Sequence, residues 1–142
     1  MRVAKVLLVA VDCGLLAYWL VTAFGWLPPD WAFKNYYDPL MVAWNWSFFP
    51  LDIAAALTGI VGVWRMRRDA SRTRLVVISL TLTFVAGMMA IGFWALAGDF
   101  DPAWWIPNIA LMVVPVVSAI LLFGKRSGAP QADTSSAASR SV

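Results

Sequence analysis

The chain has 142 residues, of which 61% are hydrophobic and 13% charged, and its mean hydropathy is +0.73. This composition excludes a soluble globular protein and predicts a single integral membrane domain, while the absence of histidine and the single cysteine predict no metal site and no cofactor. The net charge of +3 does not predict a nucleic-acid partner, because the basic residues stand in short connections between apolar runs and form no patch on a soluble surface.

Four apolar segments follow one another along the chain, at residues 3–26, 39–64, 75–97 and 104–123. Each is long enough for a membrane helix, which needs about 20 mainly apolar residues to cross about 30 Å of hydrocarbon. The connections are too short to hold a domain, so successive helices must be antiparallel neighbours. The sequence therefore predicts an all-α transmembrane four-helix bundle with up-down-up-down topology over residues 1–126. Residues 127–142 are small and polar, which predicts a disordered cytoplasmic tail.

The basic residues are distributed unevenly around these spans. Arg2 and Lys5 stand at the start of the first span, an arginine-rich run fills the connection at 65–74, and further basic residues follow the fourth span. Lys34 alone lies on the other side, where the connections are acidic. The positive-inside rule therefore predicts a multi-pass protein of the cell membrane, the plasma or inner membrane, with both termini in the cytoplasm.

The second and fourth spans begin with the same dipeptide, Asp38-Pro39 and Asp101-Pro102. An aspartate before a helix accepts hydrogen bonds from free backbone N–H groups. A proline in the first turn has no N–H group to leave unpaired. These four residues are therefore predicted to have a structural role, as helix starts.

A polar stripe runs down the second span, where Asp38, Asn45 and Asp52 are seven residues apart and share one face. Asn108 stands at the same spacing from the cap of the fourth span, which predicts a depth similar to that of Asn45. Asp12 lies near the middle of the first span, as Asp52 does in the second, so antiparallel packing predicts that the two carboxyl groups lie at comparable depth. The two asparagines are ligand-binding candidates, although such amides more often connect helices by hydrogen bonds.

The two aspartates in mid-span predict a buried acidic site. An ionised aspartate at the centre of a bilayer costs about 3 kcal/mol, and such residues usually face the bundle interior and serve a function. No span contains a basic residue that could pair with Asp12 or Asp52. We therefore expect at least one of the two to carry a proton unless a cation or an amine is bound. The structural alternative is a protonated acid that bridges two helices through hydrogen bonds.

Aromatic and proline residues of the spans add to this site. Trp44 and Trp46 are about 200° apart on one helix, so at least one is expected to point inward. Pro50 removes the backbone bond to the carbonyl of Trp46, and Pro115 does the same to Leu111, which leaves each oxygen able to accept a hydrogen bond or coordinate a cation. The alternative is that these prolines only shape the packing.

The string YYDPLMVAWNWSFFPLDI, with DCGLLAYWLVTA before it, resembles the YvaD-like family of small four-span bacterial membrane proteins. The most specific part is WNWSFFPLD, residues 44–52, and the resemblance covers the four spans without the tail. It implies the architecture and no particular chemistry. A looser resemblance, to the emopamil-binding and sigma-2-receptor-like fold, implies binding of sterols or amines. The chain lacks histidine and glutamate, so this second resemblance assigns no catalytic residue.

Three functions are compatible with these features, and all place the protein in the lipid bilayer. The first is binding or transport of a small apolar cation, amine or lipid, with a site made of Asp12, Asp52, Asn45, Trp44, Trp46 and Asn108. The second is a non-catalytic accessory or scaffold role, in which small-residue faces pack on a membrane protein partner or on a second copy of the chain. The third, an intramembrane isomerase with an acid and a carboxylate base, is less favoured, so we expect a protein that is not an enzyme.

Overall fold

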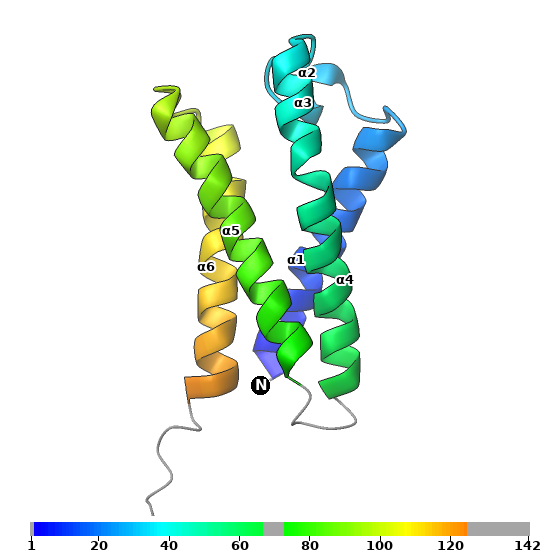
Figure 1. Ribbon diagram of the computed structural model, residues 1–142, viewed down its shortest axis with the longest axis vertical. Helices are drawn as coiled ribbons and strands as arrows, with labels where there is room; N and C mark the ends of the chain where they lie inside the picture. Colours follow the sequence, from blue (N-terminus) through cyan, green and yellow to red (C-terminus); the bar gives the residue numbers. More distant parts are fainter. Residues whose placement is uncertain (1, 67–72, 125–142) are drawn as a thin grey trace, which may run out of the picture.

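The structure, a computed structural model, describes residues 2–66 and 73–124, and these residues are helical apart from the connections (Figure 1). The helices are α1 (Arg2–Ala23), α2 (Pro29–Ala32), α3 (Pro39–Ser47), α4 (Phe49–Met66), α5 (Arg74–Leu96) and α6 (Pro102–Phe123). Four stretches are long and apolar enough to cross a membrane, namely α1, the α3–α4 pair, α5 and α6. The prediction of an all-α four-helix membrane bundle is confirmed. The predicted tail and most of the arginine-rich connection lie outside the described residues.

Two of the long helices end at a glycine in the left-handed backbone region. Gly25 follows α1 with φ of 63° and Gly98 follows α5 with φ of 69°, a conformation that a Cβ atom disfavours. After α1, the N–H of Trp26 donates to the carbonyl of Val21 (3.0 Å) and the N–H of Gly25 donates to that of Thr22 (3.2 Å). This pair of bonds defines a Schellman motif. The apolar run predicted that the first span ends at residue 26, whereas the helix ends at Ala23.

Aspartate side chains cap the starts of α3 and α6. Asp38 accepts a hydrogen bond from the backbone N–H of Leu40 at 2.9 Å, and Asp101 accepts one from that of Ala103 at 3.0 Å. A proline follows each cap in the first turn. In both helices, an aspartate side chain therefore accepts a hydrogen bond from a first-turn backbone N–H group that has no partner within the helix.

The second span is broken at Phe48, between α3 and α4. The N–H of Phe48 donates to the carbonyl of Asn45 (3.1 Å), one residue closer than in an α-helix, and the N–H of Asp52 donates to the carbonyl of Phe48 (2.9 Å). Pro50 has no N–H to donate to the carbonyl of Trp46, so the regular ladder is interrupted here. The break lies about one helical turn from Asp52, at the depth of the cavity described below.

The four spans form an antiparallel ring. α4 packs against α5 and α1, and α6 packs against α5 and α1. Figure 1 shows the spans close together at the end that holds the N-terminus and diverging toward the opposite end, where α2 and α3 lie. The bundle therefore has a packed half and an open half.

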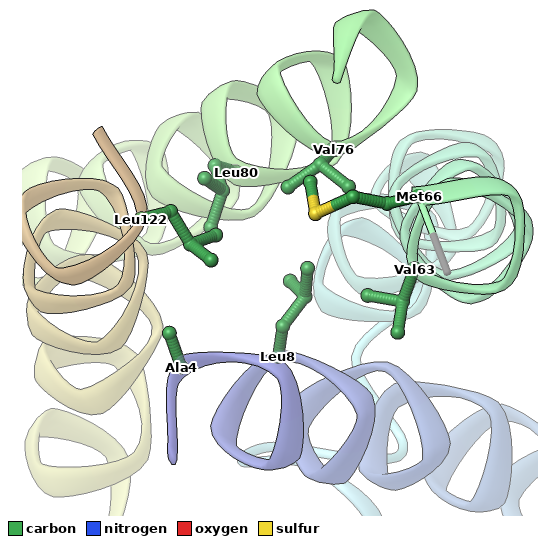
Figure 2. Packing of buried hydrophobic residues seen from close by; sticks show 7 residues of the cluster. All are labelled: Ala4, Leu8, Val63, Met66, Val76, Leu80 and Leu122. Carbon is green, nitrogen blue, oxygen red and sulfur yellow. The ribbon is translucent and has the colours of Figure 1, made fainter. Parts of the chain in front are cut away.

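All four spans contribute to the hydrophobic core of the packed half. Its side chains point toward one another in Figure 2 and are Ala4, Leu8, Val63, Met66, Val76, Leu80 and Leu122. At Gly62 a Cβ atom would lie 2.9 Å from the backbone nitrogen of Val76, so α4 and α5 approach closely here. The core holds the helices together at this end and leaves the other end to the candidate site.

Candidate functional site

A cavity of about 730 Å³ lies in the open half of the bundle, and residues of all four spans and of the α1–α3 connection line it. This volume is within the range of ligand-binding sites, about 300–1,000 Å³. Most lining side chains are apolar or aromatic, and those with polar or charged groups include Tyr18, Lys34, Asn45, Asp52 and Asn108. Of the predicted ligand-binding residues, Trp44, Asn45, Asp52 and Asn108 line the cavity, whereas Asp12 and Trp46 are not among its lining residues.

Asp52 is the acidic group of the cavity. Its side chain is 6% exposed, and its Oδ2 atom accepts a hydrogen bond from the indole nitrogen of Trp19 on α1 at 2.9 Å. Its Oδ1 atom is buried and has no hydrogen-bond partner among the described residues. The described residues also give Asp52 no ion pair, since both ion pairs found there involve Lys34. Asp52 thus lines the cavity with a carboxyl group of which one oxygen has no compensating hydrogen bond among the described residues.

Asn45 lies two turns from Asp52 and is also buried. The hydroxyl of Tyr18 lies 2.8 Å from its Oδ1 atom and 3.0 Å from the carbonyl of Ala32, so its single proton can be donated to either oxygen. The amide nitrogen of Asn45 has no partner within the part of the chain that the structure describes. Tyr18 therefore ties α1 to α3, and the buried amide nitrogen of Asn45 has no compensating hydrogen bond among the described residues.

Aromatic rings form one wall of the cavity. The centroid of Trp44 lies 4.5 Å from that of Phe93 and 5.3 Å from that of Trp94 on α5. Trp46 instead packs on Trp19 at 5.3 Å and is 39% exposed. As the spacing predicts, one of the two tryptophans on the second span points inward, and that residue is Trp44.

Residues of α6 close the cavity on the remaining side. Asn108 lines it and donates its amide N–H to the carbonyl of Trp104 at 2.7 Å. At Gly87 on α5 a Cβ atom would lie 2.6 Å from the backbone oxygen of Asn108, so the two helices approach closely at this depth. Pro115 is buried two turns further along α6 and is not a lining residue, so it shapes the helix outside the cavity.

Asp12 occupies a separate place between α1, α4 and α5. Its side chain is fully buried, and its Oδ1 atom accepts a hydrogen bond from the hydroxyl of Ser79 at 3.5 Å. Its Oδ2 atom has no hydrogen-bond partner among residues 2–66 and 73–124, and it lies against the Cα atom of Gly59, where a Cβ atom would collide with it. Asp12 is therefore packed into a junction of three helices and does not reach the cavity.

The two carboxyl groups differ in depth because of the register between α1 and α4. Trp19 lies opposite Asp52, whereas Asp12 lies opposite Gly59, so the acids are separated by about two turns, or about 10 Å at 1.5 Å per residue. A buried apolar cluster of Leu15, Ala55 and Ala56 belongs to the same pair of helices in the intervening turns. The expected pairing of the two acids at one depth is therefore not what the structure has.

Lys34 crosses the outer end of the cavity, a contact that the sequence analysis did not predict. Its ammonium group forms an ion pair with Asp99 and lies 3.7 Å from a carboxyl oxygen of Asp101, both in the α5–α6 connection. It also lies 5.8 Å from the ring centroid of Trp94. The hydrogen bond from Lys34 holds the pKa of Asp99 below its usual value of 3.8, and the same bond raises the pKa of Lys34 above 10.5. The bridge ties the α1–α3 connection to the α5–α6 connection.

We expect Lys34→Gln to lower the thermal unfolding midpoint by a small amount, and only within a defined pH window. Asp99 contributes stability above pH 3.8, which is lost as the pH falls through its lowered pKa; Lys34 contributes stability below pH 10.5, which is lost as the pH rises through its raised pKa. Both side chains are partly exposed, so salt should weaken the effect. The check is a double-mutant cycle with Asp99→Asn at pH 7 and at about pH 2. Coupling of equal size at both pH values would contradict this reading of the bridge.

Within residues 2–66 and 73–124, no three histidine, cysteine, aspartate or glutamate side chains gather into a group that could hold a metal ion. The polar groups of the cavity lining include the carboxyl group of Asp52, the amide of Asn45 and the ammonium group of Lys34, and aromatic rings surround them.

Comparison with known proteins identifies a family and a relative. Residues 4–128 match a family described as a family of unknown function, DUF5360. A protein of Bacillus subtilis (strain 168) with the name Uncharacterized protein YvaD is 39% identical over 130 residues, which cover 89% of this chain and 98% of that protein. No solved structure matches the chain. The looser resemblance to the emopamil-binding fold stays a prediction.

Proposed function

The chain belongs to the family of unknown function DUF5360, its predicted likeness to YvaD is confirmed, and from the geometry of the site we propose that it binds a small apolar cation in the outer cavity. The cation is a protonated or quaternary amine with an apolar body. Asp52 is its counter-charge, and the aromatic wall contacts its apolar part. Binding, rather than a reaction, is the function that the site supports best.

The observation that carries this proposal is the unpartnered Oδ1 atom of Asp52. This oxygen is buried without a hydrogen-bond partner among the described residues, in a side chain that lines a cavity large enough for a ligand, while the other oxygen is held by Trp19. A buried carboxylate is costly unless a positive charge or hydrogen bonds compensate it. A bound ammonium group supplies that charge, and the bond from Trp19 keeps the carboxyl group in one orientation.

The composition of the lining supports a cation with an apolar body. Trp44 and Trp94 present aromatic rings, and a cation within about 6 Å of such a ring is attracted by about 0.5–2 kcal/mol. Asn45 adds an amide to this lining, and its nitrogen has no hydrogen-bond partner among the described residues. An apolar cavity with few polar groups is typical of sites for small organic ligands.

The same lining disfavours the isomerase alternative. A proton-transfer isomerase needs one group that donates a proton and a second that accepts it. Asp52 is the one carboxyl group among the described lining residues, because Asp12 lies in its own junction. The other titratable lining groups are Tyr18 and Lys34, and Lys34 is engaged with Asp99.

We further propose that the protein lies in the cell membrane with the cavity facing outward. Among the described residues, Arg2, Lys5, Arg65 and Arg74 belong to the packed end, and the acidic caps Asp38 and Asp101 belong to the open end. This distribution supports cytoplasmic termini by the positive-inside rule. A ligand would then enter from the outer side, near the Lys34 bridge.

The experiment that tests the function compares a cation with its uncharged analogue. Phenyltrimethylammonium and tert-butylbenzene have the same shape and differ by one charge. We expect the cation to bind the purified full-length protein at least about tenfold more tightly, because only the cation compensates Asp52. Binding is measured by the change in tryptophan fluorescence and by competition.

The result that would contradict the proposal is equal or tighter binding of the uncharged analogue. The same probe tests the orientation, because a quaternary ammonium crosses bilayers poorly. Sealed vesicles with the native orientation should bind it from outside, and inverted vesicles should bind it only after permeabilisation. The opposite pattern would place the cavity on the cytoplasmic side.

A further inference from the structure

A second hollow lies at the packed end of the molecule, on the surface of α1 beside α4. Its volume is about 650 Å³, and its lining includes Arg2, Lys5, Val9, Ala10, Cys13 and Val63. It shares no lining residue with the outer cavity, so it is independent of the proposed function. We refer to it as the α1 groove.

The floor of the α1 groove is apolar and lined by small side chains. Ala10 and Cys13 are exposed on α1, and their short side chains leave the hollow between larger neighbours. Val63 of α4 and Val9 of α1 form its walls, and both also contact the hydrophobic core. The α1 groove is therefore an apolar hollow on the exposed face of a helix long and apolar enough to span a membrane.

One end of the α1 groove is positively charged. Arg2 and Lys5 are three residues apart and therefore lie on one face of α1. Neither forms an ion pair with an acidic side chain among the described residues. They stand at the first turn of a membrane span, which is the level of the lipid headgroups. Their charge is therefore available to an anionic headgroup.

The length of the α1 groove matches one leaflet of a bilayer. Arg2 and Cys13 are eleven residues apart, or about 16 Å at 1.5 Å per residue. Half of a hydrocarbon core of about 30 Å is about 15 Å. A lipid with its phosphate at Arg2 and Lys5 would therefore have an acyl chain that reaches Cys13 near the bilayer centre.

We propose that the α1 groove is a binding site for an anionic glycerophospholipid of the leaflet on the N-terminal side. The guanidinium of Arg2 and the ammonium of Lys5 donate hydrogen bonds to the phosphate oxygens, a charge-assisted contact. One acyl chain lies along Val9, Ala10 and Cys13. Charge at one end and an apolar floor of leaflet length distinguish this site from general attraction of basic residues to an anionic surface.

The test measures the association of spin-labelled phosphatidylglycerol and phosphatidylcholine with the full-length protein in bilayers. Phosphatidylglycerol should associate more strongly with the native protein, and Arg2→Gln with Lys5→Gln should reduce this preference about tenfold. The matched control is Arg65→Gln with Arg74→Gln, which removes the same charge from the same end of the bundle outside the groove. The control should keep most of the preference.

A second variant keeps the charges and fills the groove. Ala10→Leu with Cys13→Leu should displace the acyl chain and reduce the preference for phosphatidylglycerol to a similar extent, without affecting the insertion signal of Arg2 and Lys5. If the variant with Arg2→Gln and Lys5→Gln and the variant with Arg65→Gln and Arg74→Gln lost the preference for phosphatidylglycerol equally, the proposal would be overturned in favour of general attraction to an anionic surface. An unchanged preference for phosphatidylglycerol after the groove is filled would also overturn the proposal. Disulfide cross-linking between copies through Cys13 in the bilayer would overturn it as well, because a second copy of the chain would then cover the groove.

Discussion

Gly59→Ala is expected to lower the free energy of unfolding by about 1–3 kcal/mol, the usual cost of overpacking a well-packed interior. A Cβ atom at Gly59 would collide with the carboxyl group of Asp12 and would lie 2.5 Å from the hydroxyl oxygen of Ser79. Asp12 is fully buried between three helices, so it has no free space into which to move. The substitution therefore either separates α1 from α4 or breaks the bond between Asp12 and Ser79.

Gly92→Ala is the matched control, because Gly92 lies inside α5 and a Cβ atom there would meet no other atom within 4 Å. Its effect should be neutral or stabilising by up to about 1 kcal/mol, the difference in helix propensity between the two residues. Combining Gly59→Ala with Asp12→Ala should recover part of the loss, since the shorter side chain removes the collision. Equilibrium unfolding in detergent micelles gives the free energies. Equal effects at Gly59 and Gly92 would show that the junction around Asp12 is not tightly packed.

The helices could be predicted from local features of the sequence. Each apolar run is long enough to span a bilayer, and the aspartates of the two Asp-Pro pairs cap helices as their side chains allow. The end of the first span was harder to predict, because the apolar run continues to Trp26 whereas the helix ends before Gly25, which has a positive φ. Hydropathy does not register a change of backbone conformation within an apolar stretch.

The composition of the cavity could be predicted in part. The seven-residue spacing of Asn45 and Asp52 places both on one face, and both line the cavity together with Trp44 and Asn108. Tyr18 bonds to Asn45 and Trp19 bonds to Asp52, and the sequence analysis did not identify either aromatic residue. No local feature of the sequence distinguishes them from aromatic residues of the membrane interface. The partners of these two residues follow from how α1 aligns with α3 and α4.

That alignment is the reason why Asp12 and Asp52 do not meet. Each acid lies near the middle of its span, and equal depth would follow only if the two spans were aligned at their middles, whereas Asp12 lies against Gly59 in the second half of the second span. Side-chain size then selects the register, since Gly59 leaves room for a carboxyl group and Trp19 requires an acceptor for its indole N–H. Such contacts between distant residues cannot be read from the spacing within one span.

The bridge at Lys34 shows a similar limit. The sequence places Lys34 among several acidic residues of the connections opposite the arginine-rich one, but no local feature identifies a partner for it. The choice of Asp99 depends on the path of the α1–α3 connection, in which Asn35 takes a left-handed conformation with φ of 54°. Asparagine tolerates that conformation better than most residues, but the presence of Asn35 next to Lys34 does not identify Asp99 as the partner of Lys34.

Asp52→Asn is expected to weaken binding of phenyltrimethylammonium at least about thirtyfold. Removing one partner of a buried charge pair costs about 2–5 kcal/mol, and 2 kcal/mol corresponds to about thirtyfold in affinity. Asparagine has nearly the same shape, and its carbonyl oxygen can still accept the hydrogen bond from Trp19. The loss would therefore report the missing charge rather than a collapsed cavity.

The most direct test of the central claim compares this variant with Asp12→Asn in one titration of phenyltrimethylammonium followed by tryptophan fluorescence. Both substitutions remove one carboxylate from the α1–α4 interior, but Asp52 alone of the two lines the cavity. We predict that Asp12→Asn changes the dissociation constant by about twofold or less, while Asp52→Asn abolishes most of the affinity. Unchanged affinity in Asp52→Asn, or an equal loss in both variants, would contradict a cation site built on Asp52.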